Sequence, residues 1–97
     1  MDKTFYVYML ASARNGTLYL GVTSDLTKRT WQHKEGTVEG FTKKYSIKQL
    51  VWYEQHHDAL SAITREKQLK KWERAWKINL LQQENPHWRD LYEDFSA

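Results

Sequence analysis

The stretch FYVYMLASARNGTLYLGVT, residues 5–23, contains two runs rich in β-branched and aromatic residues on either side of Asn15-Gly16. An Asn-Gly pair between two such runs is the strongest short-range signal for a β-hairpin. We therefore expect one strand over residues 5–11, a two-residue turn, and a second strand over residues 17–23.

The register of this hairpin decides which side chains share a face. With a two-residue turn, Arg14 lies opposite Thr17, and Tyr8 then shares a face with Tyr19 and Gly21. Glycine has no side chain, so we expect a hollow beside the two phenols where a ligand can approach the backbone. The alternative is a pair of ordinary strand tyrosines, each with a buried ring and a hydrated hydroxyl.

Local signals predict the elements that follow the hairpin. Thr23-Ser24-Asp25 supplies capping residues for a helix over residues 26–34, and Gly36 ends that helix. Residues 37–48 are polar and basic and are predicted to form a loop. The run LVWYEQ, residues 50–55, is rich in strand-forming residues and is predicted to be the third strand.

The second half of the chain is predicted to be helical. Asp58 caps a helical pattern that extends to about residue 85, with a break near Arg74, and Pro86 ends it. The tail is expected to wrap over the core with its large apolar side chains, which are Trp88, Leu91, Tyr92 and Phe95. The expected fold is α/β, of the α+β type: a three-stranded antiparallel sheet flanked by helices, in the order ββαβαα.

The composition fits one small domain covering residues 1–97. Hydrophobic residues make up 40% and charged residues 28%, a globular balance. Cysteine is absent, which excludes disulfides, a thiolate nucleophile and cysteine-based zinc sites and favours a cytoplasmic location. The apolar run near the start is too short for a signal peptide, and no stretch reaches the roughly 18 apolar residues of a membrane span.

One stripe of the helix predicted over residues 26–34 carries polar groups. Leu26, Arg29, Thr30 and His33 fall at i, i+3, i+4 and i+7, so they share one face. A guanidinium and an imidazole one turn apart make a site for a phosphate. The alternative is an arginine whose charged end reaches solvent beside a structural histidine.

The most unusual position in the later helical pattern is Glu66. It completes an apolar stripe made of Ala59, Ala62, Ile63, Leu69 and Trp76. A carboxylate in such a core-facing position is costly unless it meets a cation. The candidates are Arg29, in a structural ion pair, and a metal ion.

Two clusters of basic residues add to a net charge of +3, which permits a nucleic-acid partner without requiring one. Around Glu66 and Glu73 lie six cations, which are Arg65, Lys67, Lys70, Lys71, Arg74 and Lys77. The second cluster mixes cations with aromatic rings and contains Phe41, Lys43, Lys44, Tyr45 and Lys48. That mixture is typical of a loop that binds a single strand or follows phosphates, and a solvated charged surface is the alternative.

Short motifs in these elements resemble those of the GIY-YIG nuclease superfamily. Tyr6-Val7-Tyr8 and Tyr19-Leu20-Gly21 are similar to its paired motif, with Tyr6 in place of the first glycine. Arg29 follows Tyr19 by ten residues, His33 follows one turn later, and Glu66 lies in the run REKQLKKW, which also matches the family pattern. The resemblance covers about residues 5–92 and is to small stand-alone bacterial members.

The resemblance implies a divalent-metal-dependent endonuclease that hydrolyses DNA phosphodiesters, of a kind linked to structure-specific cleavage in DNA repair or recombination. Glu66 would be the one protein ligand of a Mg²⁺ or Mn²⁺ ion, as suits a hard cation that keeps most of its waters. Tyr19 would be the general base for the attacking water and Tyr8 would help to position it. Arg29 would neutralise charge on the phosphoryl oxygens, and His33 would hydrogen-bond the nucleophile or the phosphate.

A free phenol keeps its proton at neutral pH, so Tyr19 could accept a proton only beside a cation. Asn79, thirteen residues beyond Glu66, is a looser match to an asparagine on the last helix of several members. Nucleic-acid contacts are expected from the basic residues Lys43, Lys44, Lys67, Lys70, Lys71 and Arg74. DNA is the expected partner, RNA is not excluded, no membrane is involved, and a protein partner or a homodimer would select the site.

Two other functions stay open. A nucleic-acid binding module without hydrolysis is suggested by Val22 and Thr23, which follow Gly21 where the repair-nuclease branch has a lysine. Such a module would bind without magnesium and independently of Glu66. A protein-interaction domain is the other alternative, and its anchors would come from the tryptophans, which are Trp31, Trp52, Trp72, Trp76 and Trp88.

Overall fold

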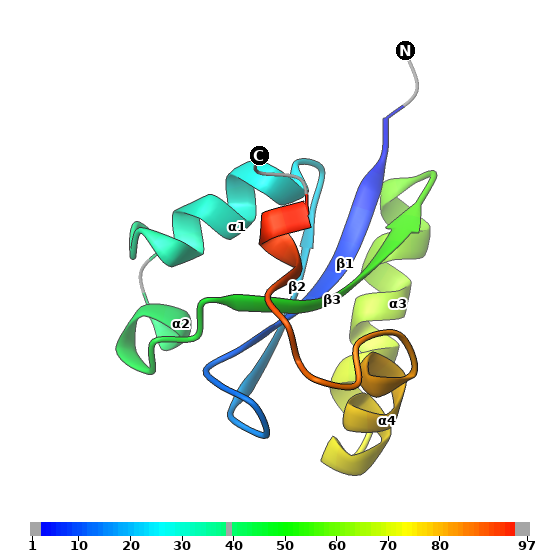
Figure 1. Cartoon of the computed structure of the whole chain (residues 1–97). Coiled ribbons are helices and arrows are strands. Elements are labelled where there is room, and N and C mark those ends of the chain that lie inside the picture. The colour runs from blue at the N-terminus through cyan, green and yellow to red at the C-terminus, as the bar shows by residue number, and fades with distance from the viewer. Residues whose placement is uncertain (1–2, 39, 95–97) are drawn as a thin grey trace.

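The computed structural model describes residues 3–38 and 40–94 and contains the predicted three-stranded antiparallel sheet. The strands are β1 (Phe5–Ala11), β2 (Leu18–Thr23) and β3 (Gln49–His56), in the spatial order β2-β1-β3 (Figure 1). The central strand β1 pairs antiparallel with both neighbours, so β2 and β3 are the two edges.

The helices are α1 (Leu26–Lys34), α2 (Phe41–Lys44), α3 (Ala59–Lys71) and α4 (Arg74–Glu84), followed by the short 3₁₀ helix η1 (Leu91–Asp94). The caps expected from the sequence are confirmed. Asp25 Oδ1 accepts a hydrogen bond from Lys28 N at 3.1 Å, and Asp58 Oδ1 accepts one from Ser61 N at 2.7 Å. None of the helices formed by the described residues is long and apolar enough to cross a membrane.

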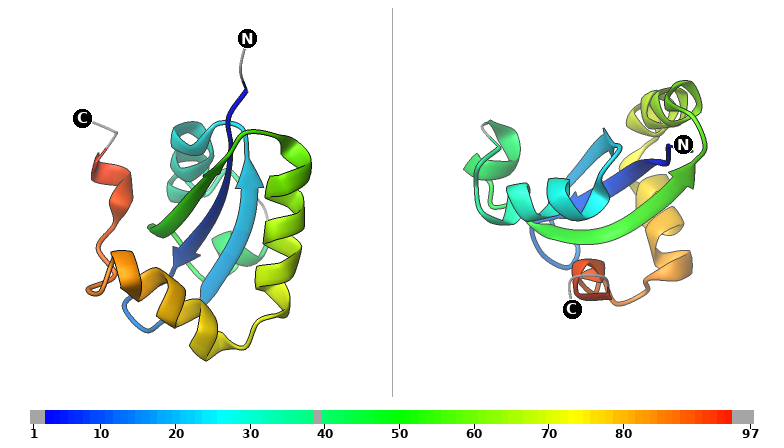
Figure 2. Two further views of the ribbon diagram at one scale, coloured as in Figure 1. Left: turned by 90° about the vertical axis from the view of Figure 1, so that its right-hand side faces the viewer. Right: turned by 90° about the horizontal axis from the view of Figure 1, so that it is seen from above.

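The sheet lies between two layers of helices, as the side views in Figure 2 show. The face that carries Tyr8 and Leu10 packs against α1 and against Ile47, which follows α2. The opposite face packs against α3 and α4 through a larger apolar cluster, which contains Val7, Met9, Ala11, Leu20, Val51, Trp52, Ala62, Leu69, Leu81 and Trp88. Tyr8 therefore points toward α1.

The hairpin turn differs from the prediction. Ser12 lies opposite Thr17, because Ser12 N donates to Thr17 O and Ser12 Oγ accepts from Thr17 N, and the loop has four residues. Gly16 N donates to Ala13 O at 2.9 Å, and Asn15 adopts a positive φ of 59°. The predicted pairing of Arg14 with Thr17 is therefore wrong. The shift is two residues, an even number, so the predicted sharing of a face by Tyr8, Tyr19 and Gly21 survives.

Two further predictions fail. Residues 37–48 are not wholly a loop, because α2 forms within them. The apolar stripe around Glu66 is also shorter than predicted: Ala62 and Leu69 are fully buried, whereas Ala59 is exposed, Ile63 is 42% exposed and Trp76 is 54% exposed. For Trp76 the reason is geometric, since α3 ends at Lys71 and α4 starts at Arg74 in a new direction (Figure 2). The predicted break near Arg74 is confirmed.

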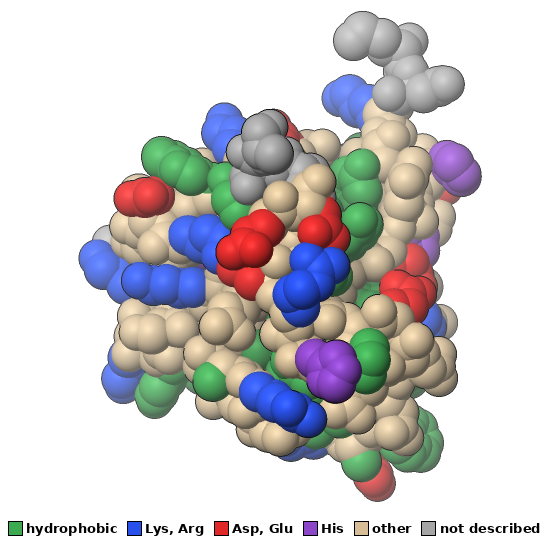
Figure 3. Space-filling model, viewed as in Figure 1, with side chains coloured by type: hydrophobic (Ala, Val, Ile, Leu, Met, Phe, Trp, Pro, Cys, Tyr) green, Lys and Arg blue, Asp and Glu red, His purple; other side chains and the backbone are tan. Residues whose placement is uncertain are grey.

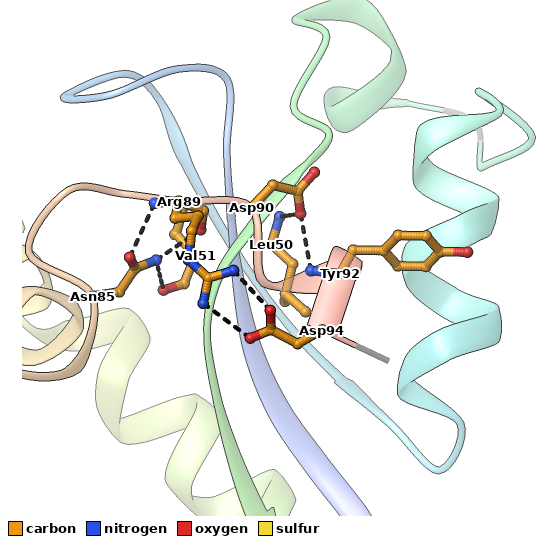
Figure 4. A network of polar contacts seen from close by, with 7 residues as sticks. All are labelled: Leu50, Val51, Asn85, Arg89, Asp90, Tyr92 and Asp94. Atoms are coloured by element: carbon orange, nitrogen blue, oxygen red, sulfur yellow. Dashed lines mark hydrogen bonds and ion pairs between the residues drawn. The ribbon is translucent and has the colours of Figure 1, made fainter. Parts of the chain in front are cut away.

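The tail is fixed to the sheet by the network in Figure 4. The Asn85 amide donates to Val51 O at 3.0 Å and to Arg89 O at 2.8 Å, and its Oδ1 accepts from Arg89 N at 3.0 Å. Asp90 accepts from Leu50 N and also forms an ion pair with Lys34 of α1. Trp88 is buried, as the predicted wrap requires, and Phe95 lies outside the described residues.

Candidate active site

Three buried side chains from three elements form a hydrogen-bonded chain between the sheet and α1. The hydroxyl of Tyr8 in β1 lies 3.2 Å from Nε2 of His33 in α1, and Nδ1 of His33 lies 2.9 Å from Oγ1 of Thr42 in α2. Their side chains are 1%, 2% and 4% exposed, in that order. Both ring nitrogens of the imidazole thus have a hydroxyl partner, and either neutral tautomer is satisfied.

The position of the Tyr8 side chain depends on the residue opposite it in the sheet. Gly21 is its partner in the β1–β2 ladder, and a Cβ at Gly21 would lie 2.4 Å from Cζ and Oη of Tyr8. The phenol of Tyr8 therefore fills the space that a side chain would take. The predicted hollow for a ligand beside Gly21 is wrong for this reason.

Burial sets the protonation of both partners. Burial raises the pKa of Tyr8 to about 12, and Arg29, as a hydrogen-bond partner and as a charge, offsets part of the rise. Burial, assisted by the positive charge of Arg29, lowers the pKa of His33 to about 4. At neutral pH Tyr8 is a protonated phenol and His33 is a neutral imidazole.

Tyr19 and Arg29 complete the group. The Tyr19 ring is half-buried, and its centroid lies 5.5 Å from that of His33 and 6.4 Å from that of Tyr8. Arg29 is also half-buried, and its Nη1 donates to Gln32 Oε1 at 3.4 Å. Arg29 lines an open groove of about 400 Å³ together with Lys28, Gln32 and the junction of residues 22–25. Arg29 and His33 thus lie one turn apart, as predicted, the charge of Arg29 acts on the imidazole, and Arg29 also lines the groove.

Glu66 is close enough to Tyr8 for its charge to contribute to the raised pKa of the phenol. Its side chain is 18% exposed, so it is largely covered. Of the two cations considered for Glu66, the Arg29 ion pair is wrong: Oε1 lies 3.0 Å from Nζ of Lys70, one turn along α3. A helical pair of this spacing contributes only about 0.3–0.5 kcal/mol, so a competing cation can replace Lys70 at small cost.

The donor set around Glu66 limits the kind of metal ion that would fit. Among the described residues, no three His, Asp or Glu side chains come together in a way that would form an all-protein metal site. A single carboxylate suits Mg²⁺, which keeps several waters and takes further oxygens from substrate phosphates. The residues present therefore fit a hard divalent ion and do not fit a structural zinc site.

The predicted nucleic-acid contacts fall into groups. Lys67 and Lys71 are exposed on α3, whereas Lys70 is paired with Glu66. Arg74 Nη2 donates to the carbonyls of Asn15 and Gly16 and so links α4 to the hairpin loop. Figure 3 shows Lys and Arg side chains gathered on the side where α1 ends and α2 lies, the region of Lys43 and Lys44, and acidic side chains over η1.

Asn79 lies elsewhere. It is exposed on α4 and lines a groove of about 300 Å³ with Trp72 and Trp76, distinct from the groove at Arg29. Of the tryptophans offered as interface anchors, Trp52 and Trp88 are buried in the core and Trp72 is half-buried. Only Trp31 and Trp76 are exposed, and they lie on different helices.

Sequence reasoning missed three residues at the site. Thr42 was hidden in the predicted loop, although Phe41 and Tyr45, at i and i+4, were a signal for one helical turn. Lys28 and Gln32 line the groove beside Arg29. The spacing of Lys28 and Gln32, at i and i+4, indicated that they share a face of the same helix.

Comparison with known proteins finds a family match over most of the chain. Residues 4–79 match the GIY-YIG catalytic domain. The chain belongs to the GIY-YIG family. The matched segment contains Tyr8, Tyr19, Arg29, His33 and Glu66, and it makes this GIY-YIG protein a member of a nuclease superfamily whose members generally use divalent metals.

Relatives of this GIY-YIG protein are small. A UPF0213 protein of Staphylococcus saprophyticus is 33% identical over 81 residues, which cover 84% of this chain and 96% of that protein. A UPF0213 protein of Pediococcus pentosaceus is 39% identical over 77 residues, covering 79% of this chain and 80% of that one. The solution structure of a UPF0213 protein from Bacillus halodurans has the same fold, with a TM-score of 0.56, 23% identity and coverage of 97% and 98% of the two chains.

Proposed function

We propose that this GIY-YIG protein is a divalent-metal-dependent endonuclease that hydrolyses DNA phosphodiester bonds, with the whole chain forming one catalytic domain. The observation that carries the proposal is the convergence of Tyr8, Tyr19 and His33 with Arg29 at the edge of an open groove. Two phenols, an imidazole and a guanidinium in contact offer a proton acceptor, hydrogen-bond donors and a fixed positive charge.

The two tyrosines have different roles in the proposed reaction. Tyr8 is buried with a pKa near 12, so it stays protonated and acts as a hydrogen-bonding group that holds its neighbours in position. Tyr19 is half-buried beside His33 and takes the role of general base. For Tyr19 to act as the base, its own proton must first pass to solvent. As the water oxygen bonds to phosphorus, the proton of the water then passes to the Tyr19 oxygen, the bond to the leaving oxygen breaks, and solvent protonates that oxygen.

Arg29 stabilises the charge that grows on the phosphoryl oxygens, because it lines the groove and is half-buried. His33 is neutral and acts through hydrogen bonds. A Mg²⁺ or Mn²⁺ ion on Glu66, when bound, supplies positive charge for the departing oxygen. Glu66 would hold such an ion by exchanging Lys70 for it.

The test is cleavage of a labelled panel of single-stranded, duplex, flap and branched DNA, and of a matched RNA, with and without Mg²⁺ or Mn²⁺. We expect Glu66→Ala to abolish cleavage and Tyr19→Phe to slow it by roughly 100-fold to 10,000-fold, the range for loss of a general base. Glu73→Ala is the control, because Glu73 is exposed and its side chain forms no cap hydrogen bond at α4. The preferred substrate in the panel would decide whether repair or recombination structures are the target.

One observation favours a module that binds nucleic acid without cleaving it. The Glu66–Lys70 ion pair satisfies the carboxylate without any metal. Binding that needs no divalent ion and survives Glu66→Ala, with no cleavage of any substrate, would overturn the nuclease proposal and support this alternative.

A further inference from the structure

The helix α2 presents two aromatic rings to solvent. Phe41 and Tyr45 are 48% and 49% exposed, and their ring centroids lie 4.8 Å apart with the ring planes at 53°. Nζ of Lys44 lies 5.4 Å from the centroid of the Tyr45 ring, and Lys43 is exposed in the same turn. We refer to Phe41, Lys43, Lys44 and Tyr45 as the α2 patch.

The segment that carries the rings is anchored to the core from the inside. Thr42 is buried and hydrogen-bonded to His33, and Ile47 is fully buried in the core below the helix. Ile47 N donates to Thr42 O at 2.9 Å and so closes the helix onto that anchor. Thr42 and Ile47 therefore hold this segment against the core, while Phe41 and Tyr45 stay exposed.

The chemistry around the rings favours a nucleic acid over a protein partner. Residues 40–48 contain three lysines and no acidic residue. Lysine is depleted in the cores of protein interfaces, whereas lysines beside exposed rings are the usual arrangement for an unpaired nucleic-acid strand. Two of the basic residues of α3 are less available, because Arg65 is paired with Glu54 and Lys70 with Glu66.

We propose that the α2 patch binds an unpaired nucleic-acid strand, with bases stacked on Phe41 and Tyr45 and phosphates beside Lys43 and Lys44. The proposal rests on the proposed function, since it takes the substrate to be nucleic acid, and it adds that part of the substrate is single-stranded. Duplex bases are already stacked inside the helix and present no face to these rings.

The α2 patch is also connected to the candidate active site. Thr42 lies between Phe41 and Lys43 in sequence and is hydrogen-bonded to His33, whose ring contacts Tyr8 and Tyr19. Figure 1 shows α2 beyond the end of α1, on the same side of the sheet. A strand held on α2 is thus attached to the element that positions His33.

Fluorescence anisotropy with a labelled single strand, its duplex and EDTA in the buffer tests the proposal without cleavage. We expect Phe41→Ala and Tyr45→Ala each to weaken single-strand binding roughly 5-fold to 100-fold, from about 1–3 kcal/mol per stacked base, while duplex binding stays within about twofold. Tyr45→Phe should retain the affinity, because it keeps the ring. Trp76→Ala is the matched control, since Trp76 is an equally exposed ring on α4, and it should bind as the native protein does.

Three results would overturn the α2 proposal: unchanged single-strand affinity, an equal loss for duplex, or an equal loss in Trp76→Ala. Thermal unfolding of each variant shows whether a loss of binding comes from unfolding, and Tyr45→Phe provides a second variant that keeps the packing. If the native protein binds both strand types and the ring variants change neither, only the α2 proposal fails. If the native protein binds no nucleic acid at all, the proposed function fails with it and the exposed rings are left to a protein partner.

Discussion

Replacing Thr42 by valine tests whether the buried hydrogen-bonded chain holds the site together. The substitution keeps the shape of the side chain and removes only its hydroxyl, and the two residues have similar helix propensities. It leaves Nδ1 of His33 without the partner that now lies 2.9 Å away, in a side chain that is 2% exposed. An orphaned buried polar group costs about 1–3 kcal/mol.

For a domain of this size, about 1 kcal/mol corresponds to a change in Tm of roughly 4–8 °C, so we expect Thr42→Val to lower Tm by roughly 5–20 °C. The matched control is Thr37→Val. Thr37 is exposed and its hydroxyl donates to the carbonyl of Gln32 at 3.0 Å, so its loss should change the free energy of unfolding by less than about 0.5 kcal/mol.

A double-mutant cycle with Tyr8→Phe identifies the mechanism. Tyr8 and Thr42 bind opposite nitrogens of the same imidazole, so the two losses should not add, and a coupling free energy of about 0.5 kcal/mol or more is expected. The reasoning is refuted if Thr42→Val unfolds at the same temperature as Thr37→Val, or if the losses of Thr42→Val and Tyr8→Phe are strictly additive.

Three more perturbations have expected outcomes. Gly21→Ala should lower the free energy of unfolding, measured in urea, by about 1–3 kcal/mol and should slow cleavage, because the added Cβ would overlap the phenol of Tyr8. A variant as stable as the native protein would show that the phenol does not fill this space. Burial lowers the pKa of His33 from 6.5 to about 4, so the unfolded chain protonates first and about 3 kcal/mol of stability is lost as pH falls from about 6.5 to about 4. The Tm should fall more steeply with decreasing pH across this range for the native protein than for His33→Gln. Parallel plots of Tm against pH for the two proteins would show that His33 is not the source of the pH dependence. Asn85→Leu should lower the unfolding free energy by about 3 kcal/mol or more, since its buried amide makes three hydrogen bonds; a loss near zero would mean that the tail is held by other contacts.

Much of the fold was predictable because its signals are local. Asp25 and Asp58 cap helices through their own side chains, and Gly36 ends α1 with a φ of 70°. The prediction that Tyr8 and Tyr19 share one face of the sheet was also correct, because any even shift in the strand register keeps them on the same face. The turn itself was wrong, since Ser12 bonds Thr17 through both its backbone and its hydroxyl and so favours the wider loop.

The partners of the site residues were harder to predict. Glu66 was correctly predicted to be a covered carboxylate, but its cation is Lys70, a neighbour at i+4 on the same helix, and not the distant Arg29. Ile63 and Trp76 were assigned to the core because a helical period gives direction without showing where the neighbouring layer ends.

Thr42 shows why part of the site needed the fold. Its contact with His33 spans nine residues of chain that include the connection from α1 to α2, and no periodicity crosses such a connection. The same argument explains Gly21: the sequence puts it on the face of Tyr8, but only the ladder shows that the two are directly opposite and that the phenol occupies the glycine's space. The residues that hold the imidazole and the phenol in place are therefore set by pairing and packing between elements, whereas the residue types that the chemistry needs are visible in the sequence.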